Sequence, residues 1–136
     1  MFDQTDRHAL FHEMHRSIEE SATHSVRQLM EGVPELTYPP NHGFKKDELE
    51  ALEALPRTPA LERALRKIVA DAVAHPLFHI LSLADGVADF PELKDVRKVD
   101  QLATEIRLHD GFYESYWAWQ RRRPDPGWRL DVYDGE

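Results

Sequence analysis

The chain has 136 residues, no cysteine, and 25 acidic against 17 basic side chains, which gives a formal net charge of −8 with histidine neutral. This length fits one domain, and the lack of cysteine excludes disulfides, thiolate metal sites and a cysteine nucleophile. Nucleic-acid binding needs a basic face, so the acidic balance and the single basic run, residues 121–123, argue against it. We expect these three arginines to stabilise the C-terminal end of a helix instead.

Neither a targeting segment nor a membrane span is expected. Residues 1–6 lack the basic and apolar regions of a signal peptide. The longest apolar stretch, residues 77–84, is far shorter than the about 20 residues that a transmembrane helix needs. We therefore expect one soluble, cytoplasmic domain over residues 1–136, without a membrane or nucleic-acid partner.

The first predicted element is a long helix that begins at Asp3 or Asp6 and ends at Glu31. An acidic residue suits the positive N-terminal end of the helix, and Gly32 with Pro34 is expected to end it. Its inward face repeats every three or four residues. The members of this stripe are Phe11, Met14, Ile18, Ala22, Ser25 and Leu29. Residues 33–43 contain three prolines and are predicted to form a surface loop.

Two further helices are predicted in the next part of the chain. A short one covers residues 45–55, with its leucines, Leu49, Leu52 and Leu55, facing inward. The next begins at Thr58-Pro59, because threonine is a good N-cap and proline fits the first helical position. Its inward stripe is Leu61, Leu65, Ile68, Val69, Ala72 and Val73. Pro76 lacks a backbone donor and crowds the preceding turn, so we predict a kink or a boundary at His75.

Residues 77–84 are apolar nearly all round and are predicted to be buried. They form either a helix that Asp85-Gly86 ends, or a strand that turns there into residues 87–90. The abundance of Leu and Ala over β-branched residues favours the helix.

A last long helix is predicted over residues 96–122, with a break near Gly111. Its stripe is Val96, Val99, Leu102, Ile106, Tyr113 and Trp117. Beyond it, residues 128–133 alternate apolar and polar side chains, which predicts an extended segment within a tail, residues 124–136, packed on the helices. The predicted fold is therefore mostly α, an irregular bundle of five or six helices with a short C-terminal extended segment.

Histidines at helical spacing are the first candidate site. Two imidazoles four residues apart on a helix can chelate a divalent cation. Three histidines form a row on the first predicted helix, and Glu19 continues that row. These histidines and three others that belong to pairs of the same spacing are the candidate metal ligands. These are His8, His12, His15, His75, His79 and His109. The interpretation that we favour is that these histidines lie at boundaries between core and solvent. His109-Asp110 resembles the metal-binding dipeptide of helical phosphohydrolases of the HD type, but the dipeptide alone does not predict that family.

The aromatic-rich helix near the C-terminus holds the second set of candidates. Asp110 either anchors a tyrosine, an arginine or a backbone donor, or caps the helix that follows a break at residues 111–113, or lines a pocket with His79 and Tyr113. Tyr113 and Trp117 fall on the predicted core stripe, whereas Trp119 projects to the other side and is a candidate contact residue if exposed. The candidate binding residues are thus Asp110, Tyr113, Trp117 and Trp119.

Catalytic signatures are absent: there is no P-loop, no dinucleotide fingerprint and no serine nucleophile elbow. Residues 1–56 hold 11 acids and 5 bases. The leading hypothesis is therefore an acidic, non-enzymatic protein-binding or regulatory module with a more basic protein partner, and no catalytic residue is named. One alternative is a metal-binding protein or metal-dependent hydrolase that uses the histidine rows and a divalent metal. A second is a small-ligand carrier with a pocket between residues 77–84 and the aromatic helix.

Overall fold

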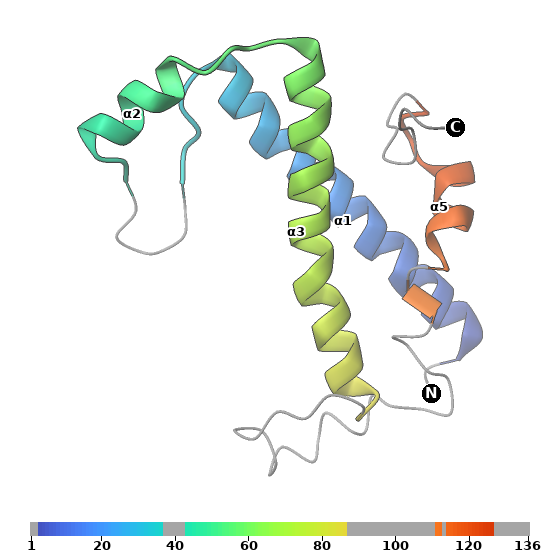
Figure 1. Ribbon diagram of the computed structural model, residues 1–136. Coiled ribbons are helices and arrows are strands. Elements are labelled where there is room, and N and C mark those ends of the chain that lie inside the picture. Colours follow the sequence, from blue (N-terminus) through green and yellow to red (C-terminus); the bar gives the residue numbers. More distant parts are fainter. Residues whose placement is uncertain (1–2, 37–42, 87–110, 113, 127–136) are drawn as a thin grey trace.

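The computed structural model describes residues 3–36, 43–86, 111–112 and 114–126, and 76% of them are helical, with no strand (Figure 1). These residues contain four helices: α1 (Gln4–Glu31), α2 (Lys46–Glu53), α3 (Pro59–Ala84) and α5 (Tyr116–Arg122). The prediction of a mostly α fold is confirmed, but this part of the chain has fewer helices than the five or six expected. The predicted extended segment, residues 128–133, and the first part of the last predicted helix lie outside the described residues.

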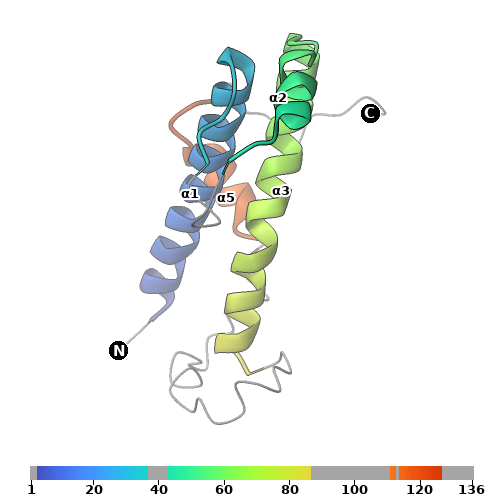
Figure 2. The ribbon, with the colours of Figure 1, turned by 90° about the vertical axis from the view of Figure 1, so that its left-hand side faces the viewer.

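Helices α1 and α3 run in opposite directions and cross, and α5 lies against the N-terminal half of α1 (Figures 1 and 2). The buried core lies where these elements meet. Its members are Phe11, Ile18, Ala22, Ala70, Leu81, Ala84 and Phe112. Phe112 is 1% exposed and is preceded by Gly111, where a Cβ would clash with the Arg7 guanidinium. The Phe11 ring would also lie 3.1 Å from that Cβ, so Gly111 lies close to α1.

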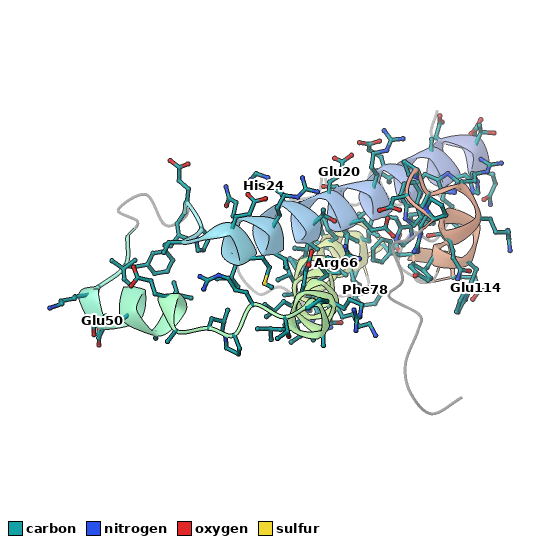
Figure 3. All side chains as sticks on the ribbon, turned by 90° about the horizontal axis from the view of Figure 1, so that it is seen from above. Glu20, His24, Glu50, Arg66, Phe78 and Glu114 are labelled. Carbon is teal, nitrogen blue, oxygen red and sulfur yellow. The ribbon has the colours of Figure 1, made fainter. Side chains whose placement is uncertain are left out.

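Helix α1 begins and ends as predicted. Asp3 Oδ1 accepts hydrogen bonds from the backbone N–H groups of Thr5 at 2.8 Å and Asp6 at 2.9 Å, and the Asp6 carboxylate accepts one from Asp3 N–H at 3.0 Å. This reciprocal capping box satisfies donors that have no partner within the helix. One member of the predicted stripe was wrong: Ser25 is exposed, and Val26 is buried in its place. Figure 3 shows Glu20 and His24 on the side of α1 that faces away from α3.

Helix α3 also begins as predicted, because Thr58 Oγ1 accepts a hydrogen bond from Leu61 N–H at 3.2 Å and Pro59 opens the helix. The predicted boundary at His75 was wrong, since Pro76 lies inside a continuous helix that includes residues 77–84. A proline removes one hydrogen bond of the helix, and packing of α3 on α1 offsets that cost. This continuity is one reason why the described helices are fewer than expected.

The inward face of α3 differs from its predicted stripe. Ile68 is 63% exposed and Ala72 is also exposed, whereas Ala70 and Leu81 are buried. Only part of this apolar helix is therefore covered. By length and composition alone, α3 is the one helix in the described part of the chain that is apolar enough to cross a membrane. Of the 18-residue stretch of α3 that meets this criterion, 22% is buried within the protein. A core helix can pass the same test, so the absence of membrane contact stays a prediction.

Helix α2 stands to one side of the α1–α3 pair and has no buried residue (Figure 1). Its leucines, expected to face inward, are only half-buried: Leu49, Leu52 and Leu55. The Arg57 side chain holds this helix in place. It donates hydrogen bonds to the carbonyls of Leu29 and Gly32 at the end of α1, each at 3.2 Å. It also donates to carbonyls at the end of α2, those of Leu52, Glu53 and Leu55.

Candidate functional site

The five candidate metal ligands within the described residues are not gathered in one place. His8 and His12 lie next to each other on α1, with ring centroids 4.1 Å apart, whereas His75 and His79 are exposed on α3. His109 lies outside the described residues. Within the described ranges, no three His, Asp or Glu side chains are grouped so that they could hold a metal ion. A metal site therefore stays a prediction, and its best support is the His8–His12 pair.

His12 is the more constrained member of that pair. Its Nε2 atom is buried and makes no hydrogen bond, and its ring lies 6.0 Å from the Trp119 ring between centroids. Burial lowers the pKa of His12, and the nearby His8 and Arg122 lower it further. A neutral imidazole with a free nitrogen is the form that binds a metal ion.

The exposure of the two candidate tryptophans is the reverse of what was expected. Trp119, considered as a contact residue if exposed, is 3% exposed, whereas Trp117, expected in the core, is 52% exposed. The Trp117 ring lies 5.4 Å from the ring of Tyr116, which precedes it on α5. Asp110 and Tyr113 lie outside the described residues. The exposed tryptophan of this helix is therefore Trp117.

His15 forms the centre of a buried cluster that the sequence did not reveal. Its Nε2 lies 2.7 Å from Ser115 Oγ, and its ring stacks on Phe112 with 5.0 Å between centroids and 4° between planes. The Tyr116 ring meets it edge-on at 6.0 Å. Burial lowers the pKa of His15 to about 4, so the ring is neutral at pH 7. His15 thus serves the core and is not a free ligand on the surface.

The contact between His15 and Ser115 does not have the geometry of a serine nucleophile activated by a histidine base. Ser115 Oγ lies 2.5 Å from the Phe112 carbonyl, which accepts the hydroxyl proton. The hydroxyl oxygen is then the acceptor for the Nε2–H of His15. A nucleophilic serine instead donates its proton to the histidine, and a third group orients that histidine. The arrangement therefore supports structure and gives no evidence of acyl-transfer chemistry.

A buried ion pair completes the cluster. Arg123 Nη2 lies 3.2 Å from Glu19 Oε1, with the two side chains 3% and 9% exposed. The same Nη2 donates a hydrogen bond to the Tyr116 hydroxyl at 2.8 Å. Burial raises the pKa of Glu19, while the nearby Trp119 indole and the charge of Arg123 act to lower it. Arg123 had been expected only to favour a helix end, and its pairing with α1 was missed.

A cavity of about 240 Å³ opens beside this cluster, between α1, α3, Phe112 and Tyr116. Its apolar lining comes from Ile18, Ala70, Ala74 and Phe112. Its polar lining comes from His15, Glu19, Lys67, Asp71 and Tyr116. The pocket that the sequence suggested lay beside residues 77–84, so this cavity is nearer the middle of α3. Glu19 also lines a second cavity, of about 330 Å³, on the side of Trp119.

Comparisons with known proteins add no family. No protein-family model, no curated protein and no solved structure matches this chain.

Proposed function

We propose that this chain is a non-enzymatic protein-binding module whose acidic helix α2 contacts a basic surface on a partner protein. The observation that carries the proposal is α2 itself. Four of its eight residues are acidic, none is buried, and the helix stands apart from the α1–α3 pair (Figure 1). A charged helix that contributes so little to the core is well placed to meet another molecule.

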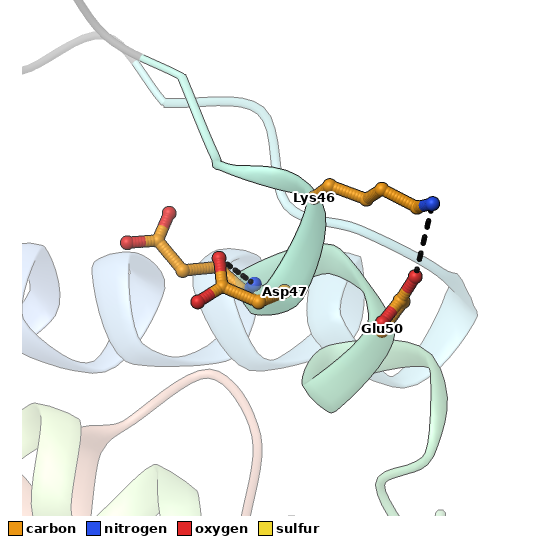
Figure 4. Close-up of polar contacts among 4 residues, drawn as sticks. Lys46, Asp47 and Glu50 are labelled. Carbon is orange, nitrogen blue, oxygen red and sulfur yellow. Dashed lines mark hydrogen bonds and ion pairs between the residues drawn. The ribbon is translucent and has the colours of Figure 1, made fainter.

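The acidic side chains of α2 are all exposed, so a partner can reach them. Lys46 Nζ lies 3.8 Å from Glu50 Oε1, and both side chains are largely exposed (Figure 4). Such an exposed pair contributes little free energy, so a cationic partner can replace Lys46 at small cost. Asp47 instead accepts a hydrogen bond from the Glu48 N–H at 3.0 Å, and Glu48 accepts one from Lys45 N–H at 2.6 Å. These two carboxylates help to begin the helix as well as carry charge.

The orientation of α2 is set before a partner arrives. Arg57 bonds the ends of α1 and α2 at the same time, so the acidic face needs little ordering on binding. The surplus of acids over bases in residues 1–56 extends the negative field beyond α2. Such a field speeds association with a cationic surface and makes the rate depend on salt.

The test is capture of a partner from an extract of the source cells at moderate salt, followed by affinity measurements on the purified complex. The informative variant is Glu50→Lys with Glu53→Lys, because both residues are exposed and a cation near the C-terminus of α2 favours the helix dipole. The charge-matched control is Glu31→Lys with Glu35→Lys, two exposed acids outside α2.

We expect a basic partner whose affinity falls at least about tenfold in the α2 variant, falls with rising salt, and changes little in the control. Failure to capture any partner would contradict the proposal. So would a partner that binds both variants equally well.

A divalent-cation site at His8 and His12 is the second candidate, and the 4.1 Å separation of their ring centroids supports it. We propose metal analysis of protein purified without a histidine tag, and melting curves with zinc, manganese or nickel. Binding predicts bound metal and a rise in melting temperature that His8→Gln removes. Substoichiometric metal and unchanged melting curves would contradict it.

A further inference from the structure

The cavity between α1, α3, Phe112 and Tyr116 is separate from α2 and has the features of a small-molecule site. We propose that it binds a small, neutral aromatic molecule with one hydrogen-bond donor, of the phenol or aniline class, which donates to Glu19. This proposal does not depend on the protein-binding role of α2.

The size of the cavity sets the size of the ligand. An apolar cavity of about 150 Å³ is enough to admit benzene. The present cavity, of about 240 Å³, therefore has room for one aromatic ring with a substituent. Its space exists because α3 presents two small residues there, Ala70 and Ala74.

The lining selects an aromatic, mainly apolar ligand. Ile18 and the two alanines contribute aliphatic surface, while Phe112 and Tyr116 contribute aromatic rings. Aromatic rings favour stacked or edge-to-face contact with a further ring. Lys67 and Asp71 add one charge of each sign to the lining, so they give no preference for a charged ligand.

Glu19 supplies the polar group that fixes the ligand's orientation. Glu19 lines the cavity, its side chain is 9% exposed, and one of its oxygens, Oε1, lies 3.2 Å from Arg123. A buried acceptor of this kind gains free energy from a donor that a ligand brings. His15 is less suited to this role, since its Nε2 is already bonded to Ser115. The charge of Arg123 offsets that of Glu19, which favours a neutral donor over a cation.

The experiment compares phenol with toluene, two rings of similar size of which only phenol carries a donor. Binding is followed by two-dimensional NMR of the full chain, with intermolecular contacts from the probe ring to Phe112 and Ile18. A hydrogen bond to a charged group predicts at least about tenfold tighter binding of phenol than of toluene. Equal affinities would overturn the role of Glu19, and absence of phenol contacts with Phe112 would overturn the site.

A pair of matched variants tests the location. Ala74→Leu fills the cavity, whereas Ala72→Leu makes the same change on the exposed face of α3. We expect phenol binding to weaken at least about tenfold in the first variant and to stay within twofold in the second. Unchanged binding in a folded Ala74→Leu protein would overturn the proposal. If that variant does not fold, the phenol–toluene comparison and the probe contacts on the native chain still decide the outcome.

Discussion

Glu19 and Arg123 form an ion pair in which both side chains are at least nine-tenths buried, and 3.2 Å separates their closest atoms. Glu19 lies in the middle of α1, and Arg123 directly follows α5, so the pair joins two distant parts of the chain. Tyr116 and Trp119 lie beside it. The pair therefore fixes α5 and the wall of the cavity against α1.

Loss of one partner of this pair is expected to destabilise the fold strongly. Glu19→Gln leaves the Arg123 charge buried without its counter-charge, and breaking a buried pair in this way costs about 3–5 kcal/mol. Chemical denaturation gives the free energy of unfolding. The control is Glu13→Gln, which removes an exposed ion pair with Arg16 on the same helix and should cost less than about 0.5 kcal/mol. Similar losses in the two variants would show that the Glu19 side chain is solvated.

Stability is expected to fall in acid because of His15. Its pKa in the folded state is about 4, below its ordinary value of 6.5, so the unfolded chain takes up the proton first as the pH falls. The contribution of His15 is fully present above about pH 6.5 and is lost between pH 6.5 and 4, by about 3 kcal/mol. The measurement is the free energy of unfolding across this range.

In His15→Gln, the free energy of unfolding should fall less between pH 6.5 and 4 than in the native chain. His24→Gln changes an exposed histidine of α1 and should leave this pH dependence as in the native chain. The comparison between variants matters because burial raises the pKa of Glu19 and so acts in the opposite direction. Identical slopes in the native chain and the His15→Gln variant would contradict the buried position of this ring.

Arg57→Lys is expected to loosen the junction of α1 and α2. Lysine cannot reach five carbonyls from one planar group, so we expect a loss of about 1 kcal/mol and faster amide exchange in α2 and at the end of α1. Hydrogen exchange read by mass spectrometry locates the effect. Arg63→Lys, at an exposed position of α3, should change neither quantity. Equal rates of amide exchange in α2 and at the end of α1 in the two variants would argue against this role of Arg57.

Pro76→Ala is expected to stabilise the chain by about 1–2 kcal/mol. Proline inside a helix lacks the N–H of one hydrogen bond, and Pro76 is exposed, so alanine restores the bond without a clash. Pro59→Ala is the control, because proline fits the first position of a helix and its replacement should not stabilise. Thermal and chemical unfolding report both changes, and a destabilised Pro76→Ala variant would argue against a helix that continues through residue 76.

The local parts of this fold could be read from the sequence. Asp3, Gly32 and the pair Thr58-Pro59 correctly placed the helix ends, because caps depend on neighbours within a few residues. Pro76 misled the prediction, since its local cost is outweighed by the packing of α3 on α1, which one sequence does not display.

The candidate site depended on distant contacts and was largely missed. His15 belonged to a recognised row of histidines, but its contact with Ser115 joins the two ends of the described chain. Arg123 was placed at a helix end by its neighbours, whereas its actual partner is Glu19. One signal was present in the sequence. Glu19 lies one helical turn from Ala22, close to the buried stripe of the first helix, and a buried carboxylate requires a counter-charge.

The most direct test of this account is the pKa of the His15 ring, measured by NMR titration of its carbon-bound protons. The cluster of His15, Phe112, Ser115 and Tyr116 predicts a value near 4, together with contacts between the His15 and Phe112 rings. A value close to 6.5 without those contacts would mean that residues 111–123 do not close over α1, and neither the buried ion pair nor the cavity would then stand.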